Sequence, residues 1–192
     1  MYSDQELQES INQAVDIMRR GGVILYPTDT VWGLGCDATN ADAVARIYAI
    51  KRRSDSKALI TLTDTAVRLA YYVTEVPEIA YQLIECTDRP LTIIYPRARH
   101  LAPNLLADDG SVGIRITSEH VSQQLCARMR TPIVSTSANI SGEPTPHNFG
   151  EISETIKTAV DYIMPMRRDE TEKAEPSGII KLNENGTFVI IR

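Results

Sequence analysis

The chain has 192 residues, and its 25 acidic and 20 basic side chains give a net charge of −5 at pH 7. This length is sufficient for one domain with a sizeable core, and we expect a single domain over residues 1–192. The negative charge argues against a protein that coats nucleic acid non-specifically, because such binding needs many Lys and Arg contacts to phosphates.

The cysteine count and the hydropathy predict a cytoplasmic protein without membrane contact. Cys36, Cys86 and Cys126 are odd in number and far apart, which indicates reduced thiols rather than a disulfide framework or a zinc site. The first residues are polar and acidic, unlike a secretory signal. No apolar stretch of the sequence approaches the ~20 residues of a membrane-spanning helix.

Strands and helices alternate along most of the chain. A first helix, capped by Ser3 or Asp4 and ended by Gly21, precedes a buried strand at 23–26, and Asn40 caps a second helix that ends in a basic run. This order predicts an α/β fold with a mixed sheet. The other predicted helices are 64–72, 77–86, 119–129 and 149–158; the other strands are 58–62, 90–95, 111–117, 132–135 and 160–164; a charged connector at 167–175 leads to a hairpin of 177–182 and 187–191.

Two hydroxyl- and glycine-rich segments each follow a short apolar strand. The opening segment, residues 26–35, reads Tyr-Pro-Thr-Asp-Thr-Val-Trp-Gly-Leu-Gly, and the second, residues 135–142, reads Ser-Thr-Ser-Ala-Asn-Ile-Ser-Gly. Small donors and an approachable backbone suit an anionic ligand such as a phosphate. Either segment alone is equally typical of a turn in which Thr, Ser, Asp and Asn bond their own backbone, and Trp32 is also a candidate core residue.

Basic side chains concentrate at Lys51, Arg52, Arg53 and Lys57. One interpretation is a solvated helix end, since cations there complement the helix dipole. The other is a clamp for a polyphosphate, whose charges Arg and Lys neutralise as a leaving group departs. Neither a P-loop nor a Gly-x-Gly-x-x-Gly motif occurs, so a nucleotide site here must have another design.

Arg115 lies within the apolar strand at 111–117, where an unpaired buried charge would be costly. It is either an arginine on an edge strand that points to water, or a fork for a ligand carboxylate. His100, His120 and His147 show no metal-ligand spacing, and we interpret them as surface or loop residues. The segment around Ser137 lacks the glycines of a nucleophile elbow, which disfavours a serine hydrolase.

Taken together, these motifs resemble the YrdC/TsaC family, the threonylcarbamoyl-AMP synthases, in its short single-domain bacterial form. The opening segment matches the family's first loop, Lys51-Arg52-Arg53 its Lys-x-Arg signature and Ser137-Ala138-Asn139 its Ser-x-Asn signature. Three positions depart from the family pattern. Trp32 replaces a usual Tyr, Leu62 stands where longer relatives carry a His, and Gly178 replaces a Thr.

The resemblance implies a twisted α/β sheet around a concave ligand-binding surface. It also implies an enzyme that combines L-threonine, bicarbonate or CO2 and ATP into threonylcarbamoyl-AMP and pyrophosphate, with Mg2+ carried by the ATP and no dedicated protein metal site. A threonylcarbamoyl transferase machinery would then modify adenosine 37 of tRNA. Alternatives are a YciO-like paralogue with another substrate, or a module that binds tRNA or double-stranded RNA. The residues implied are Lys51, Arg53, Ser137 and Asn139 for catalysis; Thr30, Arg115, Ser135 and Ser177 for threonine; and Arg53, Lys57, Ser111, Ser137, Thr145 and Arg192 for ATP.

Overall fold

A nine-stranded mixed sheet forms the framework of the computed structural model, which describes residues 2–53, 59–171 and 175–192. The strand order is β7-β1-β2-β6-β3-β5-β4-β8-β9. The strands are β1 (Ile24–Tyr26), β2 (Gly33–Gly35), β3 (Ile60–Thr63), β4 (Leu91–Tyr95), β5 (Val112–Ile116), β6 (Ile133–Ser137), β7 (Tyr162–Ile163), β8 (Gly178–Leu182) and β9 (Phe188–Ile190). The helices are α1 (Asp4–Arg19), α2 (Ala41–Lys51), α3 (Leu69–Tyr72), α4 (Glu78–Cys86), α5 (His120–Met129) and α6 (Glu154–Ala159), with short 3-10 turns at Ala66–Arg68, Pro103–Leu105 and Phe149–Glu151.

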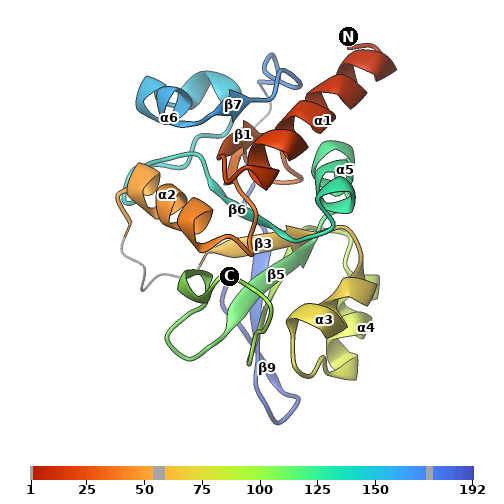
Figure 1. Ribbon diagram of the computed structural model, residues 1–192. Helices are drawn as coiled ribbons and strands as arrows, with labels where there is room; N and C mark the ends of the chain where they lie inside the picture. The colour runs from red at the N-terminus through yellow and green to blue at the C-terminus, as the bar shows by residue number, and fades with distance from the viewer. Residues whose placement is uncertain (1, 54–58, 172–174) are drawn as a thin grey trace.

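The sheet contains both parallel and antiparallel pairs. The pairs β1–β7, β3–β5 and β4–β8 are parallel, and the others are antiparallel. Figure 1 shows the ribbon, with α2 and α6 on one side of its upper half and α1 beside α5 on the other. The expected α/β fold with a mixed sheet and flanking helices is confirmed. The expectation of a single domain stays a prediction.

Three apolar clusters hold the helices against the sheet. The first packs α2 and α6 against β1, β2 and β6, the second packs α1 and α5 against β1, β3 and β6, and the third packs α3 and α4 against β4, β5 and β8. In β1 the alternation of a strand sends Leu25 to the first cluster and Ile24 to the second. Trp32 belongs to the first cluster, which confirms it as a core residue.

The helix starts follow the capping residues of the sequence. Ser3 accepts a hydrogen bond from the Glu6 amide and Glu6 bonds back to Ser3, which completes a capping box at α1. The Asn40 side chain accepts from the first amides of α2. None of the helices in the described ranges is long and apolar enough to cross a membrane.

Two strand boundaries predicted from the sequence were wrong, both next to the cavity described below. Residues 33–35 form a strand within the presumed opening loop. Gly35 is required there, because a Cβ would lie 2.6 Å from Tyr26 Cε1. Strand β6 continues through Ser137, two residues beyond the predicted end at residue 135, so Ser137 is a strand residue rather than a loop residue.

A third difference concerns the predicted helix at 149–158. It is a 3-10 turn followed by α6, because the Ser153 side chain accepts from the Ile156 amide and starts a new helix. This break lies away from the site.

Candidate active site

A cavity of about 720 Å³ lies on one face of the sheet, opposite the face that α3 and α4 cover. This volume falls within the roughly 300–1,000 Å³ of small-molecule sites. Strand alternation builds it, since every second residue of β4, β5 and β8 faces the cavity and the others face the core. One cross-strand row runs Ser135, Ile60, Gly113, Ile94 and Lys181.

The structure brings nine of the twelve predicted site residues to this one cavity. They come from the opening segment, the end of α2, strands β5 and β6, the loop after β6 and the C-terminal hairpin. The nine are Thr30, Arg53, Ser111, Arg115, Ser135, Ser137, Thr145, Ser177 and Arg192. Lys57 lies outside the described residues, and Lys51 and Asn139 lie behind the cavity wall.

Arg115 lines the cavity together with Thr30, Ser135 and Ser177, the residues that the resemblance assigns to threonine. We call this part of the cavity the amino-acid region after that prediction. The side chain is 3% exposed, and β5 lies between β3 and β4, so the interpretation as a solvated edge arginine is wrong. Its Nη2 is 2.8 Å from Asp29 Oδ1 and 3.3 Å from Thr30 Oγ1. Its buried Nε has no hydrogen-bond partner among the described residues. A ligand carboxylate would supply that partner.

Burial raises the pKa of the Asp29 carboxyl, and the Arg115 guanidinium opposes this effect. The result is a buried pair of opposite charges beside hydroxyl groups. Ser177 Oγ lies 2.9 Å from Thr92 Oγ1, a cavity residue that the sequence did not suggest. This region is chemically suited to a small zwitterion such as an amino acid.

The hydroxyl of Thr30 presents an acceptor to the cavity. Thr28 Oγ1 donates its single proton to the Val31 carbonyl at 2.8 Å, so Thr30 Oγ1 must donate in the 3.0 Å contact between the two hydroxyls. The remaining lone pairs of Thr30 Oγ1 face Arg115 and the cavity. A ligand ammonium or hydroxyl is therefore a better partner for Thr30 than a carboxylate.

Arg53 and Arg192 bring positive charge to the cavity, which they line with Ser111, Ser137 and Thr145. The resemblance assigns these residues to ATP, and we call this part of the cavity the nucleotide region after that prediction. Arg53 follows Arg52, whose left-handed backbone (φ 49°) ends α2 and whose side chain is exposed. Burial lowers the pKa of the Arg53 guanidinium. Arg192 Nε donates to the Ser177 carbonyl at 3.1 Å, so the nucleotide and amino-acid regions meet.

Lys51 is 2% exposed, and the interpretation of this lysine as a solvated helix end is wrong. Its Nζ donates to the carbonyls of Ser137 at 2.5 Å and Asn139 at 2.8 Å. Asn139 Oδ1 accepts from Ser137 Oγ at 2.5 Å. Lys51 and Asn139 thus support the backbone that carries Ser137, instead of lining the cavity. Burial, with a smaller effect of Arg53, lowers the pKa of Lys51 to about 8.

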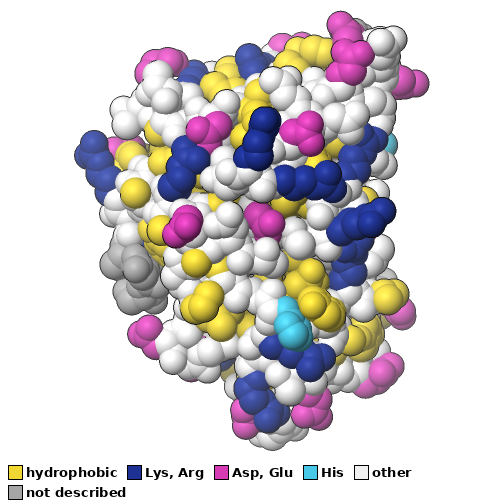
Figure 2. All heavy atoms as spheres, viewed as in Figure 1, with side chains coloured by type: hydrophobic (Ala, Val, Ile, Leu, Met, Phe, Trp, Pro, Cys, Tyr) yellow, Lys and Arg dark blue, Asp and Glu magenta, His cyan; other side chains and the backbone are white. Residues whose placement is uncertain are grey.

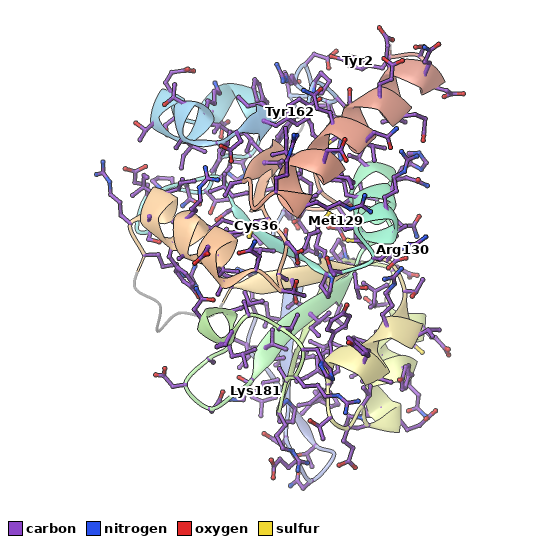
Figure 3. The ribbon with its side chains drawn as sticks, in the orientation of Figure 1. Tyr2, Cys36, Met129, Arg130, Tyr162 and Lys181 are labelled. Carbon is purple, nitrogen blue, oxygen red and sulfur yellow. The ribbon has the colours of Figure 1, made fainter. Side chains whose placement is uncertain are left out.

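The sequence missed the charged pair Asp109–Lys181 at the cavity. Lys181 Nζ lies 2.8 Å from Asp109 Oδ2, and hydrogen bonds from Lys181 and Ser111 lower the pKa of Asp109 to about 2. Figure 3 labels Lys181 in the lower half of the molecule, near β9. The signal was present, because Ser177, just before β8, and Ile179 and Lys181 within it lie two residues apart and line the cavity.

Two of the departures from the family pattern lie in strands around the cavity. Leu62 is fully buried in the second cluster and pairs with Arg115 in the β3–β5 register, so it is a core neighbour of that arginine. Gly178 begins β8, directly after the cavity residue Ser177.

The histidines are surface residues, as expected. His100, His120 and His147 are exposed, and His100 stacks on Tyr71 with ring centroids 4.4 Å apart. Within the described ranges, no group of three or more His, Cys, Asp or Glu side chains is arranged to hold a metal ion.

A basic patch lies outside the cavity, and it is a surface to consider for the alternative of an RNA-binding module. Figure 2 shows Lys and Arg side chains along the side of the molecule where α1 and α5 lie in Figure 1, and Figure 3 places Arg130 at the end of α5. Arg19 and Arg128 border the same surface hollow as Arg130. Arg19 bonds the Arg128 carbonyl and Arg128 bonds Asn12 and Gln8, so two of these arginines already hold α1 against α5.

The fold and the cavity define an α/β protein with a concave site of small-molecule size, lined by cationic and hydroxyl side chains. Residues 16–192 match the family model Sua5_yciO_yrdC, described as "Telomere recombination", and the chain belongs to this Sua5/YciO/YrdC family.

Curated relatives carry the name threonylcarbamoyl-AMP synthase. The one from Halorhodospira halophila is 32% identical over 86% of this chain and 87% of its own length, and the one from Cellvibrio japonicus is 35% identical over 83% and 85%. The one from Vibrio cholerae is 38% identical over 72% of this chain and 75% of its own length.

Solved structures agree with this assignment. E. coli YciO has a TM-score of 0.83 and 30% identity over 96% of this chain and 89% of its own. P. abyssi Sua5 complexed with L-threonine has a TM-score of 0.81 and 28% identity over 95% of this chain. This chain spans 53% of that longer protein.

Proposed function

We propose that the chain is an L-threonylcarbamoyladenylate synthase, a nucleotidyltransferase that makes threonylcarbamoyl-AMP and pyrophosphate from L-threonine, bicarbonate or CO2, and ATP. The observation that carries the proposal is a single cavity in which a buried Arg115–Asp29 pair adjoins the cationic nucleotide region. Family membership and the names of the relatives support it. We further propose a cytoplasmic location and delivery of the product to a transferase machinery that modifies adenosine 37 of tRNA.

The proposed reaction needs no covalent enzyme intermediate. The threonine amine nitrogen attacks the carbon of CO2 and loses a proton, which gives a carbamate. A carbamate oxygen then attacks the α-phosphorus of ATP. The bond between this phosphorus and the oxygen that bridges the α- and β-phosphates breaks, and pyrophosphate leaves with the electron pair. Such a reaction depends on placement and charge neutralisation. We assign the carboxylate of threonine to Arg115 and the departing phosphates to Arg53 and Arg192.

We propose that Mg2+ enters with ATP. Mg2+ commonly keeps several waters and binds through substrate phosphates and one or two carboxylates, rather than in an all-protein cage. Asp108 and Asp109 are the carboxylates among the described cavity residues that are able to contact it. When bound, the ion would neutralise charge on the phosphate oxygens.

The test compares neighbouring arginines. Arg53→Gln should lower threonine-dependent pyrophosphate release by about 10²–10³-fold, as for loss of one transition-state donor. Arg52→Gln is the matched control, because Arg52 is exposed and does not line the cavity; its rate should stay within about twofold, since exposed side chains away from a site contribute little. Full activity of Arg53→Gln would refute the assignment.

A second candidate is a YciO-like enzyme with another substrate, favoured by the similarity to E. coli YciO. An amino-acid panel separates the two. A synthase releases pyrophosphate with L-threonine and far more slowly with L-valine, which has the same shape but lacks the hydroxyl. A paralogue shows no such preference.

A further inference from the structure

Arg167 lies outside the cavity and connects three segments of the chain. Its Nη1 donates to the Thr28 carbonyl at 3.0 Å and lies 3.6 Å from Glu119 Oε1. Its Nε is 2.8 and 2.9 Å from the two carboxylate oxygens of Glu170. Glu119 is also the N-cap of α5. The guanidinium is therefore fixed between the opening segment, α5 and the segment after β7.

The Thr28 carbonyl belongs to the turn that shapes the amino-acid region. Thr28 is 2% exposed, and its hydroxyl accepts from the Thr30 amide at 3.0 Å. Thr30 Oγ1 contacts Thr28 Oγ1 on one side and Arg115 on the other. A continuous series of polar contacts thus runs from Arg167 through Thr28 and Thr30 to Arg115.

We propose that Arg167 is a positioning residue for the amino-acid region of the cavity. It is not among the residues that line the cavity, but holds the Thr28–Thr30 turn so that the Thr30 hydroxyl and the Asp29 carboxylate meet Arg115. A bond from a charged donor to a carbonyl is among the stronger hydrogen bonds, and its loss leaves the turn held by its own short contacts. This inference rests on the proposed function for its kinetic effect, although not for its structural effect.

Arg168 provides a matched control one residue away. Its guanidinium donates to the carbonyls of Met164 at 2.9 Å and Ile163 at 2.6 Å and lies 5.1 Å from the centre of the Phe149 ring. It has the same size and charge as Arg167, but these contacts are with residues 163–164 and Phe149 and not with the opening segment.

The experiment compares Arg167→Met, Arg167→Lys and Arg168→Met by amide hydrogen exchange and steady-state kinetics. Arg167→Met should speed exchange in a peptide covering residues 27–32 and raise KM for L-threonine about 10-fold, which corresponds to about 1.4 kcal/mol. The KM for ATP should stay within about twofold. Arg167→Lys keeps one charged donor and should recover part of both effects, and Arg168→Met should show neither.

Two outcomes overturn the proposal. One is unchanged exchange at residues 27–32 in Arg167→Met; the other is an equal change in Arg168→Met. If the wild-type protein shows no threonine-dependent turnover, the proposed function fails, while the exchange measurement still decides the role of Arg167. If Arg167→Met does not fold, Arg167→Lys carries the same comparison.

Discussion

Removal of the Arg115 guanidinium should have two separable consequences. The side chain is 3% exposed and its Nη2 lies 2.8 Å from Asp29 Oδ1, which is 7% exposed. Arg115→Met leaves the carboxylate buried without its cation, and breaking a buried pair in this way costs about 3 kcal/mol or more. For a chain of this size, that loss lowers Tm by about 6–12 °C. The same change removes the proposed partner of the threonine carboxylate.

The double variant Arg115→Met/Asp29→Asn separates stability from function. Because it removes both charges, it should recover most of the lost unfolding free energy, measured by urea denaturation. Its threonine-dependent pyrophosphate release should nevertheless stay at least about 30-fold below wild type. The threonine carboxylate would lack its cationic partner, which costs about 2 kcal/mol or more. Three results would contradict this role of Arg115: Arg115→Met is as stable as wild type, the double variant is no more stable than Arg115→Met, or the double variant keeps full activity.

Two further predictions concern Lys51 and two glycines. The pKa of Lys51 is about 8 in the folded protein and near 10.5 in the unfolded chain. Between these pH values the unfolded chain binds more protons than the folded protein, so the free energy of unfolding rises with pH, by at most about 1.4 kcal/mol per pH unit. The unfolding free energy of wild type minus that of Lys51→Met should therefore become more positive from pH 8 to pH 10. A difference that does not change with pH would contradict the burial of a lowered-pKa lysine. Gly35→Ala places a Cβ 2.6 Å from the buried ring of Tyr26 and should lower the free energy of unfolding by about 1–3 kcal/mol. In Gly113→Ala the nearest atom is 3.3 Å away, so the free energy of unfolding should fall by less than about 1 kcal/mol. Because Gly113 lines the cavity, the added methyl group should raise the substrate KM. Equal losses of stability in the two glycine variants, measured by urea denaturation, would show that the close contact at residue 35 does not decide the cost.

Local signals in the sequence were sufficient for much of the framework. The caps at Ser3 and Asn40 set the starts of two helices, and β4, β5 and β8 were located within one or two residues. The signals for these three strands were apolar runs and, for β8, the Asn-Gly turn of the hairpin, all of which depend on neighbours in the chain. The strand at Gly33–Gly35 was missed because its residues show no alternation, and its geometry depends on a tyrosine ring that crosses it.

The site was predictable as a set of residues but not as a set of contacts. The motif resemblance gathered residues as distant as Thr30 and Arg192, which do share one cavity. It did not reveal that Lys51 bonds carbonyls under the loop, because that depends on the path of residues 137–139 above the end of α2. Nor did it suggest the partnership of Asp109 with Lys181, since pairing across 72 residues follows from the sheet order.

The most direct measurement asks whether the carbon of bicarbonate and the nitrogen of L-threonine enter one adenylate product. The protein is incubated with ATP, Mg2+, carbon-labelled bicarbonate and nitrogen-labelled L-threonine, and the adenylate fraction is analysed by mass spectrometry alongside Arg53→Gln. We expect an adenylate that carries both labels, formed one-for-one with pyrophosphate and strongly reduced in Arg53→Gln. Pyrophosphate release that proceeds without threonine, or an adenylate that lacks the bicarbonate carbon, would contradict the proposed reaction.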